Sequence, residues 1–138
     1  MYLKIIAGGQ TGVDSGALKF ALDHHLPCGG YCPKGRKNEN GKIDRTIKNV
    51  MESDGTLIIK DAHPFGKGTS DTIDLCKKYH KPLFFSGISR QKESRILFLS
   101  WLSSGQINVL NIAGNRESQS PGIEEKTYRI LEFLLHPA

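Results

Sequence analysis

The stretch Ile5-Ile6-Ala7-Gly8-Gly9-Gln10-Thr11-Gly12-Val13-Asp14 decides how the chain begins to fold. The apolar run that enters it predicts a buried strand over residues 2–7. Three glycines and a threonine follow, and the spacing of the next apolar residues predicts a helix over residues 11–25. A strand that leads through a glycine-rich turn into a helix directs backbone N–H groups at one point, where the helix dipole favours negative charge. The stretch therefore predicts an anion site formed by Gly8, Gly9, Gln10, Thr11 and Gly12.

The composition is that of one ordinary globular domain, which we expect to span residues 1–138. Of the 138 residues, 38% are hydrophobic and 24% are charged, which suffices for one core. No apolar run is long enough to cross a membrane, and Met1 leads almost directly into the first strand, so we expect neither a membrane span nor a signal peptide. The 3 cysteines lack the spacing of a zinc site and indicate reduced thiols. We therefore expect a cytoplasmic protein without a metal site.

Apolar segments and helical segments alternate along the rest of the chain. Further strands are predicted over residues 28–32, 56–60, 82–86 and 107–112, and helices over 45–52, from Thr69 or Ser70 onward, around 96–101, and from Ser120 onward. About five strands separated by helices indicate one α/β domain of three layers, with a mostly parallel sheet covered on both faces. Such folds bind ligands at the carboxyl ends of their strands, where the strand order reverses.

A second glycine-rich turn, Gly66-Lys67-Gly68-Thr69, follows the third predicted strand and opens a helix. It combines two glycines, a cation and a hydroxyl at a helix N-terminus, and so predicts an anion site for the same reason as the first turn. Two such turns after neighbouring strands can hold one phosphate-bearing molecule between them, with Gly66, Gly68 and Thr69 as contacts. A plain connection between strand and helix is the alternative.

Two further segments carry cations that suit an anionic ligand. Between Pro33 and Lys48 there are six cations and two anions, and we expect Lys34, Gly35 and Arg36 to bind the ligand. A solvated loop is the alternative for this segment. After the last strand, Arg116 can hold a phosphate or carboxylate, and Asn115 and Ser118 can contact a polar ring. An exposed turn at Arg116 is the alternative there.

Three aspartates are candidates for acid–base chemistry. Asp14 follows Thr11 with the spacing of a capping box, so helix capping competes with a ligand contact. Asp54 is explained equally well by the turn into the third strand, and Asp71 lies in an early turn of a predicted helix. Spacing alone argues for no nucleophile and base, so whether the protein is an enzyme stays open.

Four motifs together resemble the putative molybdenum carrier family. They span residues 8–14, 29–36, 53–56 and 111–118, in that order, and so cover nearly the whole chain. The resemblance implies a Rossmann-like α/β domain with a pocket for a nucleotide or a pterin phosphate, often within a homodimer or larger homo-oligomer. The wider superfamily includes the lonely-guy phosphoribohydrolases, whose P-G-G-x-G-T-x-x-E motif ends in a catalytic glutamate. Thr72 stands at that position here, so the resemblance does not extend to that catalytic group.

These observations favour a binding or carrier protein for a small anionic ligand. The ligand would be a phosphate-bearing heterocycle, either molybdenum cofactor (molybdopterin) or a nucleotide, held by the glycine-rich loops. The alternative is a nucleotide-processing hydrolase that cleaves an N-glycosidic or phosphoester bond, with Asp14, Asp54 or Asp71 as its acid or base. A nucleic-acid-binding module is a remote alternative, because the sequence pI is near 9.2 but only Tyr31 stands beside the basic segment for stacking on bases.

Overall fold

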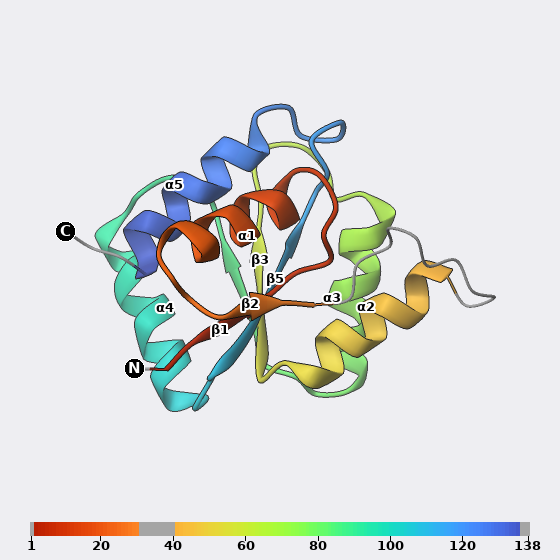
Figure 1. Ribbon diagram of the computed structural model, residues 1–138, viewed down its shortest axis with the longest axis horizontal. Coiled ribbons are helices and arrows are strands. Elements are labelled where there is room, and N and C mark those ends of the chain that lie inside the picture. Colours follow the sequence, from red (N-terminus) through yellow and green to blue (C-terminus); the bar gives the residue numbers. More distant parts are fainter. Residues whose placement is uncertain (1, 31–40, 136–138) are drawn as a thin grey trace.

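In the computed structural model, which describes residues 2–30 and 41–135 (of residues 41–44, the backbone only), five strands form one sheet (Figure 1). The strands are β1 (Lys4–Ile6), β2 (Cys28–Gly29), β3 (Gly55–Ile59), β4 (Leu83–Ser86) and β5 (Val109–Gly114). Their order across the sheet is β2-β1-β5-β3-β4, and each neighbouring pair is parallel. The α/β class predicted from the sequence is confirmed, and the sheet in the described part of the chain is parallel throughout.

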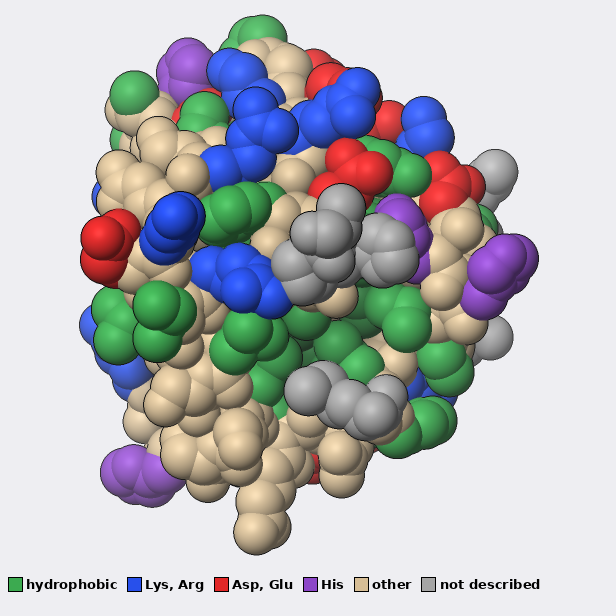
Figure 2. Space-filling model, turned by 90° about the vertical axis from the view of Figure 1, so that its left-hand side faces the viewer, with side chains coloured by type: hydrophobic (Ala, Val, Ile, Leu, Met, Phe, Trp, Pro, Cys, Tyr) green, Lys and Arg blue, Asp and Glu red, His purple; other side chains and the backbone are tan. Residues whose placement is uncertain are grey.

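Helices cover both faces of this sheet. They are α1 (Val13–Asp23), α2 (Gly41–Glu52), α3 (Lys67–Lys78), α4 (Lys92–Ser104) and α5 (Ile123–Leu135). Helices α1, α4 and α5 lie on one face, and α2 and α3 lie together on the other (Figure 1). Figure 2 shows the side of the molecule formed by α4 and α5, where hydrophobic side chains lie among basic ones. No helix within the described residues is long and apolar enough to span a membrane.

The central strands are buried because helices pack on both of their faces. All five residues of β3 are buried, including Leu57, Ile58 and Ile59. This explains why the strand is apolar without the alternation of a sheet that has one wet face. On one face the core is completed by Phe20 of α1 and Leu131 of α5, which are both fully buried.

The order of the strands places a ligand crevice at β5. From β1 the chain continues into α1 on one face, whereas from β3 it continues into α3 on the other face. Strand β5 lies between β1 and β3. Its residue Asn111 pairs with Ile6 of β1 on one side and with Thr56 of β3 on the other. The loops after β1 and β3 therefore diverge on either side of β5. This is the switch point at which open parallel sheets bind their ligands.

Two helices begin at glycines rather than at the predicted polar caps. Helix α1 begins at Val13, and its N-cap Gly12 has a φ of 81° with no side-chain cap, so the capping box predicted from Thr11 and Asp14 is wrong. Helix α3 begins at Lys67 with Gly66 as its N-cap, so neither Thr69 nor Ser70 caps it. In both helices the glycine lets another loop approach the first turn closely.

The last strand and the last helix both start two residues or more after their predicted positions. Strand β5 spans Val109–Gly114 and carries its pairing up to Gly114, whose partner is Ile59. Pro121 lies in a turn instead of the first helical position, and α5 begins at Ile123. The side chain of Glu117 caps this helix by accepting hydrogen bonds from the N–H groups of Gly122 and Glu124.

Candidate functional site

A cavity of about 400 Å³ lies at the switch point of the sheet, between α2 and α3. This volume is in the range of sites for small molecules. The carboxyl-terminal half of β5 forms its floor, and the loops after β1, β3 and β5 form its rim. Its lining residues are Gly8, Gln10, Asp14, Arg45, Thr46, Asn49, Lys67, Gly68, Thr69, Asp71, Thr72, Asn111, Ile112, Ala113, Gly114, Arg116 and Gln119. Residues of the two predicted glycine-rich turns thus line one cavity.

The N-terminus of α3 opens into this cavity. Lys67, Gly68 and Thr69 form the first turn of the helix and line the cavity, and no acidic side chain occupies that turn. Within the described residues, no acceptor is recorded for the N–H groups of these three residues. A Cβ atom built on Gly68 meets nothing within 4 Å, so the backbone is open there. Unpaired amides at the positive end of a helix dipole form a site for an anion.

The first glycine-rich turn uses its amides internally. The N–H of Val13 donates to the carbonyl oxygen of Asn115 at 3.1 Å, so the loop after β5 occupies the N-terminus of α1. Gly12 has a positive φ, and a Cβ there would collide with that same carbonyl oxygen. The N–H of Gln10 donates to Asp14 Oδ2 at 3.2 Å. The amides of Gln10 and Val13, which flank the predicted phosphate site, are therefore used within the protein itself.

What this turn presents to the cavity is the carboxyl group of Asp14. A Cβ on Gly8 would lie 2.9 Å from Asp14 Oδ2, so the glycine lets the loop pass close beside this group. Burial raises the pKa of Asp14 from 3.8 to about 7, against the opposing effects of hydrogen bonds from Gln10 and Gly8 and of the positive charge of Arg116. The cavity thus holds a carboxyl group that exchanges its proton near neutral pH.

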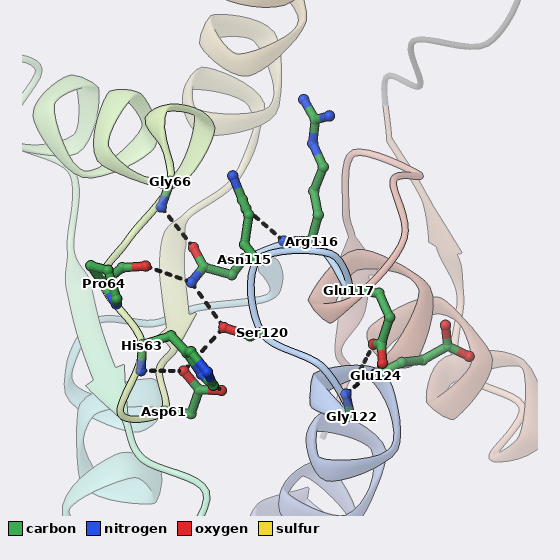
Figure 3. Close-up of polar contacts among 11 residues, drawn as sticks. Asp61, His63, Pro64, Gly66, Asn115, Arg116, Glu117, Ser120, Gly122 and Glu124 are labelled. Atoms are coloured by element: carbon green, nitrogen blue, oxygen red, sulfur yellow. Dashed lines mark hydrogen bonds and ion pairs between the residues drawn. The ribbon is translucent and has the colours of Figure 1, made fainter.

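Three cations surround the cavity. Lys67 Nζ lies 3.2 Å from Asp71 Oδ2, but its side chain is 84% exposed, so this pair contributes little. The side chain of Arg116 extends away from its neighbours in Figure 3, and within the described residues its guanidinium has no hydrogen-bond partner. Arg45 of α2 likewise has no recorded carboxylate partner there. Two guanidinium groups are therefore available to an anion at the rim.

Asn115 joins the loops that form the rim (Figure 3). Its Oδ1 accepts hydrogen bonds from the N–H of Gly66 at 2.9 Å and from the Thr69 hydroxyl at 3.4 Å. Its Nδ2 donates to the carbonyl oxygen of Pro64 and to Ser120 Oγ. The predicted contact of Asn115 with a ligand ring is not what the structure shows, because every polar atom of the side chain already has a partner. The residue instead positions the N-terminus of α3 against β5.

A polar chain continues this network away from the cavity to the surface. Ser120 Oγ donates to Asp61 Oδ1 at 3.1 Å, and the backbone N–H of His63 donates to the same oxygen at 2.9 Å. Burial raises the pKa of Asp61, but the hydrogen bonds from His63 and Ser120 outweigh that effect and lower it. Within the described residues, no group of three His, Cys, Asp or Glu side chains is placed to hold a metal ion.

Comparison with known proteins identifies the family. The sequence profile of the circularly permutated YpsA SLOG family matches residues 5–45 and 42–135. The chain belongs to this family. A solved crystal structure, that of a putative molybdenum carrier protein from Syntrophus aciditrophicus SB, is 40% identical in sequence with a TM-score of 0.85. The match covers 97% of this chain and 95% of that one, and it confirms the resemblance to putative molybdenum carriers. A search of curated proteins gave no significant match.

The YpsA-type fold brings together only some of the residues predicted from the sequence. Gly8, Gln10, Asp14, Gly68, Thr69, Asp71 and Arg116 line the cavity. Gly9, Thr11, Gly12, Gly66, Asn115 and Ser118 do not, although Gly12 and Asn115 hold the rim together. Asp54 lies at the opposite end of the sheet, where it accepts hydrogen bonds from the N–H groups of Asn108 and Val109. Lys34, Gly35 and Arg36 lie outside the described residues.

Among the lining residues that were not predicted from the sequence are four polar residues of α2 and β5: Arg45, Thr46, Asn49 and Asn111. The first three stand at positions i, i+1 and i+4 of α2 and share one face of that helix. Asn111 is a polar residue inside an otherwise apolar strand. Such a residue is a usable signal, because a buried amide in a central strand needs a partner. Thr72, which stands where the lonely-guy enzymes carry their glutamate, also lines the cavity.

Proposed function

We propose that this protein binds a phosphate-bearing heterocycle in the cavity between α2 and α3 and carries it without turnover. The ligand class comprises nucleotides and molybdopterin-type pterin phosphates. The observation that supports the proposal most strongly is the open first turn of α3, where three amides without acceptors face a cavity of about 400 Å³. A phosphate placed there accepts hydrogen bonds from the backbone and gains from the helix dipole.

The charges at the rim support the same ligand. Arg116 and Arg45 line the cavity from opposite sides, the first from the loop after β5 and the second from α2. Charge-assisted hydrogen bonds from a guanidinium group to phosphate are among the strongest polar contacts in proteins. The relative from Syntrophus aciditrophicus is described as a putative molybdenum carrier. Molybdenum cofactor is a pterin that carries a phosphate, so this ligand belongs to the proposed class.

Gly68 offers a direct test of this proposal. A methyl group at position 68 meets no protein atom within 4 Å, and Gly68 lines the cavity beside the amides that would bind phosphate. The substitution Gly68→Ala should leave the fold intact and raise its stability by up to about 1 kcal/mol, because alanine favours the helix more than glycine does. It should weaken the binding of inosine 5′-monophosphate or a pterin monophosphate at least tenfold, as measured by isothermal titration calorimetry.

Gly87→Ala provides the matched control. A Cβ atom at Gly87 also meets nothing within 4 Å, and Gly87 lies after β4, outside the cavity lining. This variant should bind as the wild type does. If neither nucleotides nor pterin phosphates bind the wild-type protein, or if Gly68→Ala binds them unchanged, the proposal is wrong.

One observation favours a second function, the hydrolysis of a nucleotide. Asp14 lines the cavity, and its pKa, raised to about 7 by burial, suits a general acid at neutral pH. Under this alternative, wild-type protein incubated with nucleoside monophosphates releases free base or phosphate, detected by chromatography. Asp14→Asn should then reduce the rate at least a hundredfold while ligand affinity persists. Binding without any product supports the carrier instead.

A further inference from the structure

The floor of the cavity contains a buried amide in the middle of the sheet. Asn111 belongs to β5, the central strand, with Ile6 of β1 and Thr56 of β3 as its register partners. Only 3% of its surface is exposed, and it lines the cavity. An amide buried at this depth destabilises the fold unless both of its polar ends are satisfied.

One end of this amide is satisfied by the protein. Asn111 Nδ2 donates to Thr56 Oγ1 at 3.2 Å. Beside it on α3 is the thiol of Cys76, whose pKa is raised by burial against a smaller lowering effect of the Thr56 hydroxyl. As the acceptor of the hydrogen bond from Nδ2, the Thr56 hydroxyl presents a lone pair to Asn111. This arrangement fixes which end of the amide faces the sheet.

The other end of the amide faces the cavity. Within the described residues, no donor reaches Asn111 Oδ1. In that part of the chain, the side-chain nitrogen and oxygen atoms that are fully buried and lack a hydrogen-bond partner are Arg95 Nε and Thr127 Oγ1. Asn111 Oδ1 is not among them, so it is accessible, and the cavity is what Asn111 lines. The floor therefore presents a fixed hydrogen-bond acceptor.

This acceptor lies well below the proposed phosphate site. Asn111 stands three residues before Gly114, the end of β5, which corresponds to about 10 Å along a strand. The amides of Gly68 and Thr69 lie at the rim, at the start of α3. A ligand whose phosphate contacts α3 thus places its far end, the heterocycle, toward Asn111.

From this geometry we infer that Asn111 determines the specificity of the cavity by accepting a hydrogen bond from an N–H group on the buried edge of the ligand's heterocycle. Rings with a lactam N–H, such as 6-oxopurines and pterins, belong to the selected class, whereas rings that present only acceptors at that edge are rejected. The inference rests on the proposed function and adds the chemical class of the ring.

Three phosphate-bearing compounds distinguish the contribution of the ring contact to binding from that of the phosphate contact. Inosine 5′-monophosphate has an N–H at its ring edge, purine riboside 5′-monophosphate has a bare nitrogen there, and ribose 5-phosphate has no ring. Titration calorimetry should show that inosine 5′-monophosphate or a pterin monophosphate binds at least tenfold more tightly than purine riboside 5′-monophosphate. A buried acceptor left without a donor accounts for a preference of that size.

Two variants test whether Asn111 causes this preference. Asn111→Leu removes the acceptor while keeping the branched shape of the side chain, and should abolish the preference while ribose 5-phosphate binds as before. Thr56→Val removes the partner of Nδ2, frees the amide to turn over, and should reduce the preference at least threefold. Asn108→Leu makes the same substitution at an exposed site just before β5 and should change neither affinity.

The outcomes distinguish the two proposals. If purine riboside 5′-monophosphate binds as well as the better lactam phosphate, or if Asn111→Leu keeps the preference, the role of Asn111 is refuted, whereas binding of ribose 5-phosphate still supports the phosphate site. If none of these phosphates binds, the proposed function itself fails. Loss of the preference in Asn111→Leu and its reduction in Thr56→Val confirm the inference.

Discussion

Replacing Asp14 with asparagine should make the ligand-free protein more stable at neutral and alkaline pH. The carboxyl group lines the cavity, and burial raises its pKa from 3.8 to about 7. Ionised Asp14 is therefore less favourable in the folded state than in the unfolded chain. Asparagine has nearly the same shape and still accepts the hydrogen bond from the N–H of Gln10, but it carries no charge.

The sign and size of the effect follow from proton linkage. Well below pH 3.8 the group is protonated in both states, and it changes stability little. As the pH rises from 4 to 7, the unfolded chain loses the proton first, so wild-type stability falls, and above pH 7 the loss is constant. The difference between a pKa of 3.8 and one of about 7 corresponds to a loss on the order of 4 kcal/mol. Asp14→Asn should escape this loss.

Urea denaturation at a series of pH values measures the effect. Trp101 is the single tryptophan of the chain, and it packs against Phe84 and Phe98 in the core. Its fluorescence therefore reports unfolding. Asp14→Asn should be at least 1 kcal/mol more stable than the wild type at pH 8, and the two should converge near pH 4. Asp74→Asn, which changes an exposed aspartate on α3, is the control and should follow the wild-type curve. Parallel curves for Asp14→Asn and the wild type would refute the reasoning.

Two more substitutions test how the rim of the cavity is held. Gly12→Ala places a Cβ against the carbonyl oxygen of Asn115 at a φ of 81°, so urea denaturation should show a loss of more than about 1 kcal/mol, and an unchanged midpoint would contradict the tight approach. Asn115→Ala leaves the N–H of Gly66 and the carbonyl of Pro64 without their partner, so we expect a loss of about 2–4 kcal/mol and faster hydrogen exchange at the start of α3. A loss below about 0.5 kcal/mol with unaltered exchange would show that the rim does not depend on this residue.

The sequence predicts the α/β class because its signals are local. The apolar run of β3 and the turn at Gly66–Thr69 can each be recognised within a few residues of sequence. In the structure the first is a buried strand, and the second is a helix start that lines the cavity. Asp14 and Arg116 were also found in this way, since Asp14 lies in the first turn of the helix after β1 and Arg116 lies in the loop after β5.

The use of the first glycine-rich turn could not be predicted, because it depends on which strand lies beside β1. Strand β5 comes from the far end of the chain, and its loop brings the carbonyl oxygen of Asn115 to the amide of Val13. An amide that is open in the isolated motif is thereby used by the protein itself. The contribution of Arg45 and Asn49 was missed for a similar reason, since only the tertiary fold sets α2 across the cavity from α3.

The central claim, that the first turn of α3 holds the anionic group, is tested most directly by amide chemical shifts. The ¹⁵N-labelled protein is titrated with inosine 5′-monophosphate or a pterin monophosphate, and two-dimensional NMR spectra are followed to saturation. The amide signals of Lys67, Gly68 and Thr69 should show the largest shifts and give one common affinity. Shifts confined to Gly9, Gly12 and Val13, with α3 unaffected, would contradict the account.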